Sequence, residues 1–257
     1  MSHPAIIIEH DDFVVVNKPS GVSMHQGSNA HNNKNVQTIL AWALQIGLTC
    51  PLYLVHRLDT HTSGCLLLAK HKSPAAALSA LFENRQITKF YIALSDKKSS
   101  KKQGRISTDM VKSRNGSYKL ASSTKSPAVT FFQRQTLNQA TKLVSHAPRY
   151  LYYLKPITGK THQLRVALKS LGSTILGDSR YKGAVADRLY LHSLMLNFTY
   201  LGENFSCTAL PTQGAFFDKD LLGQMKDPTS FNWPRYQHPN RAKNRVENAK
   251  NNMIEYK

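Results

Sequence analysis

The sequence predicts an α+β fold built on a mixed, largely antiparallel sheet that is flanked by helices and loops. Short β-branched segments follow one another with only a few helical segments between them, without the strict strand–helix alternation of a parallel sheet. Hydrophobic residues make up 41% of the 257 residues and aromatic residues 9%, which is enough for a substantial core. No internal repeat is visible, so we expect one large domain with an appended tail.

The first half of the chain predicts five strands and two helices. A helical pattern over 37–47 ends at Gly47, and an amphipathic helix over 73–85 starts with Ser73 as N-cap and Pro74 in its first turn. The turn signal Lys18-Pro19-Ser20-Gly21 ends the second strand. The expected strands cover residues 5–9, 13–17, 53–55, 65–69 and 89–94.

The composition changes after residue 94. Residues 95–126 are rich in Ser, Lys and Arg and predict a long loop or a poorly packed hairpin. From Lys219 the chain is basic, rich in Asn and interrupted by three prolines, which favours an extended or loosely attached conformation. We therefore divide the chain into a domain over 1–218 and a basic C-terminal tail over 219–257. Between them we expect a helix over 161–171, closed by Gly172, and strands at 128–133, 142–146, 150–154, 189–201 and 205–210.

The charge of the chain is strongly positive. Lys and Arg number 34 against 15 Asp and Glu, which gives a formal net charge of +19. Such an excess destabilises a compact chain by self-repulsion and is typical of proteins with a polyanionic partner, so nucleic acid is the first expectation. A membrane partner is not expected, because no stretch approaches the roughly 20 apolar residues that span a bilayer. The N-terminus does not resemble a signal peptide, so we expect a cytoplasmic protein.

One short polar segment stands between two apolar strands. It reads His56-Arg57-Leu58-Asp59-Thr60-His61-Thr62-Ser63-Gly64, and Asp59 is the only acid between Asp12 and Glu83. An exposed loop aspartate that pairs with Arg57 or caps a turn is the simplest interpretation. However, an acid, an arginine, two histidines and several hydroxyl groups gather on a loop between core strands, which is how functional sites are usually built.

A second polar segment reads Thr158-Gly159-Lys160-Thr161-His162-Gln163-Leu164-Arg165. Its Gly-Lys-Thr resembles the phosphate-binding loop of nucleotide hydrolases, but that loop requires glycine where this chain has Leu154. What remains is a helix N-terminus with hydroxyl groups and a lysine, which favours anion binding. His162 and Arg165 share a helix face, although a plain surface charge is an equally good interpretation of Arg165.

Other chemistries lack their motifs. The chain has no HExxH, no paired CxxC and no acid–histidine cluster with metal-ligand spacing, so we expect no metal. The nucleophile elbow GxSxG and the dinucleotide motif GxGxxG are also missing. A conventional glycosidase needs two carboxylates at the scissile bond. Asp178 is the only other acid in a dense polar setting, and we interpret it as a turn residue.

Taken together, these segments resemble the RluA-type RNA pseudouridine synthases. They occur in the family's order and span residues 13 to about 200, and HRLDxxTSG together with HQLR is highly specific. Two departures are mild, because Lys160 stands where the family usually has Arg and Ala167 where His is frequent. The matching segments are Asn17-Lys18-Pro19-Ser20-Gly21, HRLDTHTSG at 56–64 followed by LLLAK, Lys89-Phe90-Tyr91-Ile92-Ala93-Leu94, TGKTHQLR at 158–165 followed by LGSTILGDSRY, and Arg188-Leu189-Tyr190-Leu191-His192.

The resemblance implies the pseudouridine synthase fold and an RNA uridine isomerase that needs no cofactor. Asp59 matches the family's catalytic aspartate, which attacks the uridine at the anomeric carbon or at carbon 6 before the base rotates and rejoins through carbon 5. Arg165 matches the arginine that pairs with this aspartate and keeps it ionised. Tyr91 matches the aromatic residue that stacks on uracil and helps to remove the proton from carbon 5.

The resemblance also implies RNA-binding residues. Arg57 matches a residue that enters the RNA stack in place of the flipped uridine, because chemistry on a base requires flipping. His56 and Lys70 are expected to support the loop or to contact phosphate, and a structural histidine is favoured for His56. The anion-binding helix start adds Lys160, Thr161 and His162 as expected substrate contacts.

Three functions stay open on the sequence alone. The leading one is uridine isomerisation in ribosomal or transfer RNA, between which the sequence does not distinguish. The second is a non-catalytic RNA-binding protein that retains the fold, although it would not need Asp59, Tyr91 and Arg165 together. The third is a hydrolase that releases the base with the same nucleophile. We expect a monomer.

Overall fold

The computed structural model describes residues 5–24, 37–138 and 147–236. Its helices are α1 Ile39–Gln45, α2 Lys72–Glu83, α3 Gln163–Ser170 and α4 Lys219–Gln224, and 3-10 turns form at η1 Arg114–Gly116, η2 Ser179–Tyr181 and η3 Pro228–Ser230. Its strands are β1 Ile6–Glu9, β2 Phe13–Lys18, β3 Tyr53–Leu54, β4 Ser63–Ala69, β5 Thr88–Ser95, β6 Gln103–Thr108, β7 Met110–Lys112, β8 Tyr118–Leu120, β9 Ala128–Thr136, β10 Tyr150–Pro156, β11 Leu191–Tyr200 and β12 Glu203–Thr208.

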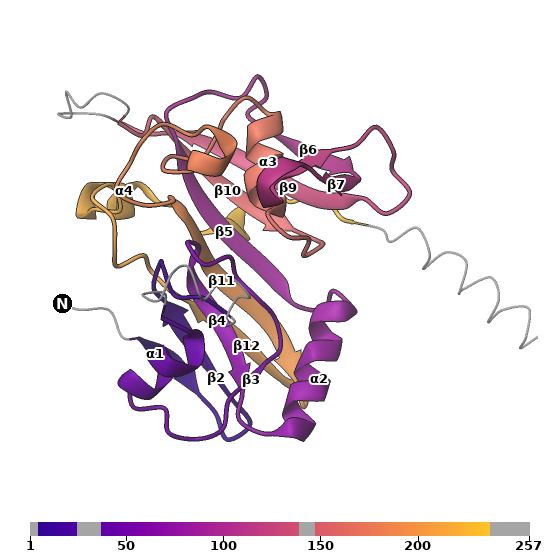
Figure 1. The fold of residues 1–257 in the computed structure, drawn as a ribbon, viewed down its shortest axis with the longest axis vertical. Coiled ribbons are helices and arrows are strands. Elements are labelled where there is room, and N and C mark those ends of the chain that lie inside the picture. The colour runs from indigo at the N-terminus through magenta and orange to yellow at the C-terminus, as the bar shows by residue number, and fades with distance from the viewer. Residues whose placement is uncertain (1–4, 25–36, 139–146, 237–257) are drawn as a thin grey trace, which may run out of the picture.

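Ten of these strands form one mixed sheet in the order β1-β2-β4-β11-β5-β10-β9-β6, with β12 added to β11 and β3 to β4. Its pairings are antiparallel except that of β4 with β11, which is parallel. The expected α+β fold with a largely antiparallel sheet is therefore confirmed. Figure 1 shows β5 and β11 in the middle, α1 and α2 beside the β2–β4 end, and α3 and β7 at the other end.

The central strands are buried on both faces. In β2, Val14 and Val16 join one apolar cluster with Trp42 of α1, whereas Phe13 and Val15 join a second cluster on the opposite face. Strand β4 is buried along its whole length in the same way. Successive side chains of a strand point to opposite faces, so two helices on opposite sides cover this end of the sheet. The result is a rigid frame for the loop between β3 and β4.

One expectation about local structure is wrong and another is confirmed only in part. Helix α2 begins at Lys72 with His71 as its N-cap residue, and the His71 side chain makes no capping hydrogen bond, whereas Ser73 was the expected cap. In residues 95–126 the expected hairpin is present as β7 and β8, but β6 also pairs with β9 at the edge of the main sheet, so the segment is more ordered than a loop. An edge strand exposes one side to water, so its polar composition does not prevent pairing. The strand expected at 142–146 lies outside the described residues.

The chain after Lys219 packs on the sheet instead of extending away from it. The Asp218 side chain caps α4, and Leu221 is buried. Farther on, the Phe231 ring lies edge-on to Tyr153 with centroids 4.8 Å apart. The expected loose attachment is therefore wrong for residues 219–236, because their scattered apolar side chains cover one face of the sheet. Residues 237–257 lie outside the described residues. Within the described part of the chain, no helix is long and apolar enough to cross a membrane.

Candidate active site

The loop that carries Asp59 connects β3 to β4 and is held in place by hydrogen bonds from the Lys18 side chain. The buried ammonium group of Lys18 donates to the carbonyl oxygens of Val22 at 2.9 Å and of Thr60 at 3.1 Å. The Gly21 N–H donates to the same Thr60 oxygen at 2.9 Å. Burial lowers the pKa of Lys18 to about 7. No role for Lys18 was expected from the sequence, and its contacts show that it holds the Asp59 loop against the turn after β2.

A close backbone approach ends this loop. Gly64 has φ of +108°, and a Cβ atom there would lie 2.1 Å from the Ser193 carbonyl oxygen of β11. Only glycine fits this position without moving one of the two strands. Beside it, the Ser63 hydroxyl lies 2.7 Å from Nδ1 of the buried His192 and accepts a hydrogen bond from Arg188 at 2.7 Å. The end of the Asp59 loop is thus fixed in the one parallel pairing of the sheet.

Asp59 meets Arg165 from the start of α3, as expected, but the geometry differs from a two-point pair. The Arg165 guanidinium donates to both carboxylate oxygens of Asp178, from Nε at 2.8 Å and from Nη2 at 2.7 Å. Its Nη1 reaches Oδ2 of Asp59 at only 3.5 Å. Nε and Nη2 form the fork that takes both oxygens of Asp178, which leaves Nη1 for a single contact with Asp59. The two-point partner of Arg165 is therefore Asp178, not Asp59.

Burial separates the roles of these two acids. The Asp178 side chain is 1% exposed, whereas the Asp59 side chain is 19% exposed. Burial by itself would lower the pKa of Arg165, but the hydrogen bonds and charge of Asp178, with the charge of Asp59, raise it. Asp178 also caps η2, so the turn role expected for it is only part of its function. A single sequence contains no signal that pairs this turn residue with Arg165.

His162 links this site to the β7–β8 hairpin. It precedes α3 in a left-handed conformation with φ of 57°, and its Nε2 lies 4.0 Å from Oδ2 of Asp59. Its Nδ1 lies 3.0 Å from the Tyr181 hydroxyl, which accepts the backbone N–H of Tyr118 in β8 at 2.9 Å. Burial lowers the pKa of His162, and the nearby Asp59 opposes this effect only in part. The lowered pKa favours the neutral imidazole beside Asp59.

The loop before α3 is held together largely by Gln163. Its side-chain oxygen accepts the Thr158 hydroxyl at 2.7 Å and the Lys160 N–H at 3.0 Å, and its amide nitrogen donates to Val129 of β9 at 3.0 Å. The Lys160 ammonium donates to the Ser126 carbonyl oxygen. Some of the N–H and hydroxyl groups that were expected to bind an anion therefore make hydrogen bonds within the protein.

The remaining expected residues fall into two groups. Arg57 is exposed and lines the same cavity as Asp59, as do Lys160, Thr161 and His162. His56 lies in the wall, where its Nε2 accepts the Leu67 N–H at 2.9 Å and its ring stacks on Phe82 with centroids 4.2 Å apart. Burial lowers the pKa of His56 to about 3. Lys70 does not reach the cavity, because it pairs with Glu9 at 2.9 Å.

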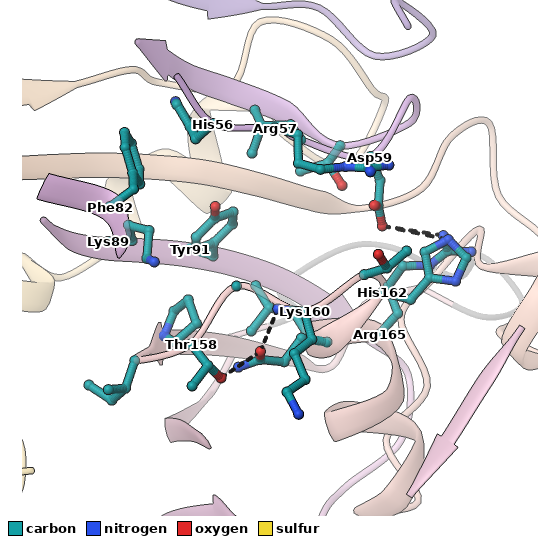
Figure 2. Close-up of a pocket in the computed structure, with 18 of the residues that line it drawn as sticks. His56, Arg57, Asp59, Phe82, Lys89, Tyr91, Thr158, Lys160, His162 and Arg165 are labelled. Atoms are coloured by element: carbon teal, nitrogen blue, oxygen red, sulfur yellow. Dashed lines mark hydrogen bonds and ion pairs between the residues drawn. The ribbon is translucent and has the colours of Figure 1, made fainter. Parts of the chain in front are cut away.

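These residues surround one elongated cavity of about 480 Å³, within the usual range for a small-molecule site. In Figure 2, Asp59, His162 and Arg165 lie at one end, Phe82 and Lys89 lie at the other, and Tyr91 lies between them. Tyr91 is 8% exposed, and burial raises its pKa. Within the described residues, no three metal-ligating side chains gather. A partly exposed carboxylate and an aromatic ring that line the same cavity suit a flat ring as a ligand.

Comparisons with known proteins identify the family of this chain. Residues 12–170 match the RNA pseudouridylate synthase family. A Haemophilus influenzae protein named as an uncharacterized RNA pseudouridine synthase is 43% identical over 84% of this chain and 92% of its own length. Ribosomal large subunit pseudouridine synthase C of Rickettsia bellii is 33% identical over 88% of this chain and 69% of its own.

Solved structures show the same fold. Human RNA pseudouridylate synthase domain containing 1 matches with a TM-score of 0.65 and 26% identity over 81% of this chain and 84% of that one. The human domain containing 4 protein matches with a TM-score of 0.61 and 27% identity over 85% of this chain and 92% of that one. The chain therefore belongs to the RNA pseudouridylate synthase family. It is an RNA-modifying isomerase, which forms pseudouridine from uridine in RNA.

Proposed function

We propose that Asp59 is the nucleophile of this isomerisation and that the substrate is a flipped uridine of a structured RNA. The observation that carries the proposal is the state of the Asp59 carboxylate. Its Oδ2 has only long contacts, with Nη1 of Arg165 at 3.5 Å and Nε2 of His162 at 4.0 Å, and its Oδ1 accepts no hydrogen bond from any described residue. Both oxygens therefore keep lone pairs for a new bond, while Asp178 keeps Arg165 in place.

The reaction conserves all atoms of the uridine. Asp59 attacks the anomeric carbon or carbon 6 and forms a covalent bond to it. The bond from the anomeric carbon to N1 breaks, a bond from the anomeric carbon to carbon 5 replaces it, and the bond to Asp59 breaks again, which restores the carboxylate. The proton on carbon 5 is lost and N1 gains one, so the product has the same composition as the substrate. Tyr91 lies in the wall between the two ends of the cavity, where its ring can stack on the uracil and its hydroxyl can assist the proton transfer.

The rim residues serve base flipping in this proposal. Arg57 is exposed above the cavity, where a planar cation can fill the gap that the extruded base leaves in the RNA stack. Thr161 and His162 line the cavity from the start of α3, and Lys160 lies beside them. We assign these three residues to contacts with the flipped nucleotide and its phosphate.

We further propose that the target is ribosomal RNA of the large subunit. Several relatives are named ribosomal large subunit pseudouridine synthase C, with 30–34% identity to this chain. The test is to map pseudouridines in ribosomal and transfer RNA from cells with and without the gene. Loss of one site in large-subunit RNA supports the proposal. Loss of a site in transfer RNA alone would overturn this target and leave the chemistry untouched.

The mechanism is tested by incubating RNA with the purified protein and measuring pseudouridine and free uracil. The wild type should yield pseudouridine without free uracil, and Asp59→Asn should abolish the reaction while retaining RNA binding. Asp11→Asn, which changes an exposed aspartate outside the cavity, should have no effect. Free uracil as the product would indicate a hydrolase, and activity of Asp59→Asn within about tenfold of wild type would exclude Asp59 as the nucleophile.

A further inference from the structure

A second feature of the cavity, at the end away from Asp59, is a buried lysine that pairs with no described residue. Lys89 precedes Tyr91 by two positions on β5, so both side chains point to the cavity face of the sheet. Lys89 is 8% exposed, lines the cavity, and lies with its ammonium 5.9 Å from the centre of the Phe82 ring. No described residue offers this ammonium a hydrogen-bond acceptor or a carboxylate within ion-pair distance.

The charges around Lys89 are mostly of the same sign. Arg85 is exposed and lines the cavity, and its side chain has no hydrogen bond to a described residue. Glu83 is the one carboxylate besides Asp59 among the described lining residues, and it forms no ion pair with Lys89. Burial and the charge of Arg85 lower the pKa of Lys89 to about 8. A second cation thus acts on Lys89, and no described carboxylate compensates its charge by an ion pair.

A buried cation is costly unless an anion compensates it. The compact ammonium of lysine is a common ligand of phosphate, whereas the uncharged carbonyl groups of uracil would not require a buried positive charge. In Figure 2, Tyr91 separates Lys89 from Asp59, so a base that stacks on Tyr91 leaves Lys89 to the adjoining backbone. We propose that Lys89, with Arg85 at the rim, forms a subsite for a phosphodiester next to the target uridine. This inference rests on the proposed function, because it takes RNA as the ligand.

The first test compares two lysines. Lys89→Met removes the charge and retains the aliphatic stem. Lys155→Met is the matched control, because Lys155 is half-buried, lies 5.6 Å from the Phe90 ring and does not line the cavity. With an RNA that the wild type modifies, Lys89→Met should weaken binding about tenfold or more. The slope of log Kd against log salt should fall by about 0.7, and Lys155→Met should change neither value.

The second test locates the phosphate. RNA oligonucleotides that carry one uncharged methylphosphonate, moved stepwise along the positions around the target uridine, are bound to the wild type and to Lys89→Met. At the phosphate that Lys89 binds, the substitution should weaken binding to the wild type as much as Lys89→Met does. The same substitution should cause no further loss of affinity in Lys89→Met, because both changes remove the same interaction. Additive losses of affinity at every position would overturn the subsite.

Two further outcomes would also overturn the subsite. An unchanged salt slope in Lys89→Met would show that Lys89 neutralises no phosphate of the bound RNA. A fall in the single-turnover rate with intact affinity would place the ammonium at the reacting base. Arg85→Gln is a second variant that leaves the core unaltered, because Arg85 is exposed. It should also lower the slope of log Kd against log salt. If the wild type itself forms no pseudouridine, the proposed function fails, whereas a modifying wild type with an unaffected Lys89→Met removes only the subsite.

Discussion

The guanidinium of Arg165 contacts Asp178 through two hydrogen bonds of 2.8 and 2.7 Å and reaches Asp59 through a single contact of 3.5 Å. The arginine is thus fixed to the protein by an acid that is shielded from the substrate. Asp59 benefits from the positive charge but is not held by it. In the proposed mechanism Asp59 exchanges its electrostatic partner for a covalent bond, and a loose contact makes that exchange less costly than a tight pair would.

Asp178→Asn should therefore lower both stability and activity. Breaking a buried ion pair leaves an uncompensated charge, so we expect the free energy of unfolding to fall by about 3 kcal/mol in urea titrations. The single-turnover rate should fall at least about tenfold, because Arg165 loses its alignment. Glu9→Gln is the control, since it breaks the partly exposed pair with Lys70 and should cost less than about 1 kcal/mol. Equal effects of the two substitutions would contradict the role given to Asp178.

Arg165→Lys should not preserve activity, although it preserves the charge. An ammonium group cannot hold both oxygens of Asp178 and still direct a third nitrogen toward Asp59. We expect a loss of at least about a hundredfold in the single-turnover rate at saturating RNA. A near-normal rate would show that only the positive charge of Arg165 matters.

Stability should fall as the pH is lowered from 7 to 5. Burial lowers the pKa values of His56 and His192 to about 3, so both stay neutral in the folded protein while they take up protons in the unfolded chain below about pH 6.5. Their stabilising effect is present above pH 6.5 and is lost as the pH falls toward 3. Between pH 7 and pH 5, each histidine should lower the free energy of unfolding by about 2 kcal/mol.

The histidine prediction is checked by urea unfolding at several pH values. The slope of the free energy of unfolding against pH gives the number of protons taken up on unfolding. His56→Gln should reduce this number by about one, whereas His71→Gln, at an exposed position, should leave the slope unchanged. Identical slopes in wild type and His56→Gln would show that His56 takes up no proton on unfolding.

Replacing Lys89 should stabilise the free protein. Met avoids the cost of burying an uncompensated ammonium, so we expect Lys89→Met to raise the free energy of unfolding by about 1–3 kcal/mol at pH 7. Because the pKa of Lys89 is lowered to about 8, the gain should be fullest below pH 8 and shrink as the pH rises further. A destabilised Lys89→Met at pH 7 would mean that the ammonium is well accommodated without RNA.

Removing residues 237–257 should weaken RNA binding without affecting the rate of the bound complex. This stretch contains five Lys or Arg and two Glu, a net charge of +3. The salt slope should fall by up to about 0.7 for each RNA phosphate that these residues neutralise. An unchanged slope would show that they do not bind RNA. Truncation after residue 218 should instead destabilise the fold, because it uncovers the sheet surface on which Phe231 and Trp233 pack.

The sequence predicts the local elements and the site segments better than the contacts among them. Alternating and continuous apolar runs identify β2 and β4, and the motif residues Asp59 and Arg165, although 106 positions apart, do meet. Pairing with Asp178 is not predictable in this way, because it depends on how η2 is positioned relative to α3. The role of Lys18 is hidden for the same reason, since its acceptors are backbone carbonyl groups.

Segments without periodicity are the other source of error. Phe231 and Trp233 are isolated aromatic residues in a basic, Asn-rich stretch, so no pattern indicates their packing on the sheet. Strand β6 is polar because one of its sides faces water, and its partner β9 supplies the order that its own composition lacks.

The β7–β8 hairpin meets the catalytic end through Tyr118, Tyr181 and His162, and within the described residues it pairs with no strand of the main sheet. Its outward-facing charges can therefore change over evolutionary time without disturbing the frame that aligns Asp59. Charge substitutions on the exposed side of this hairpin are therefore expected to leave the contact between Asp59 and Arg165 unchanged.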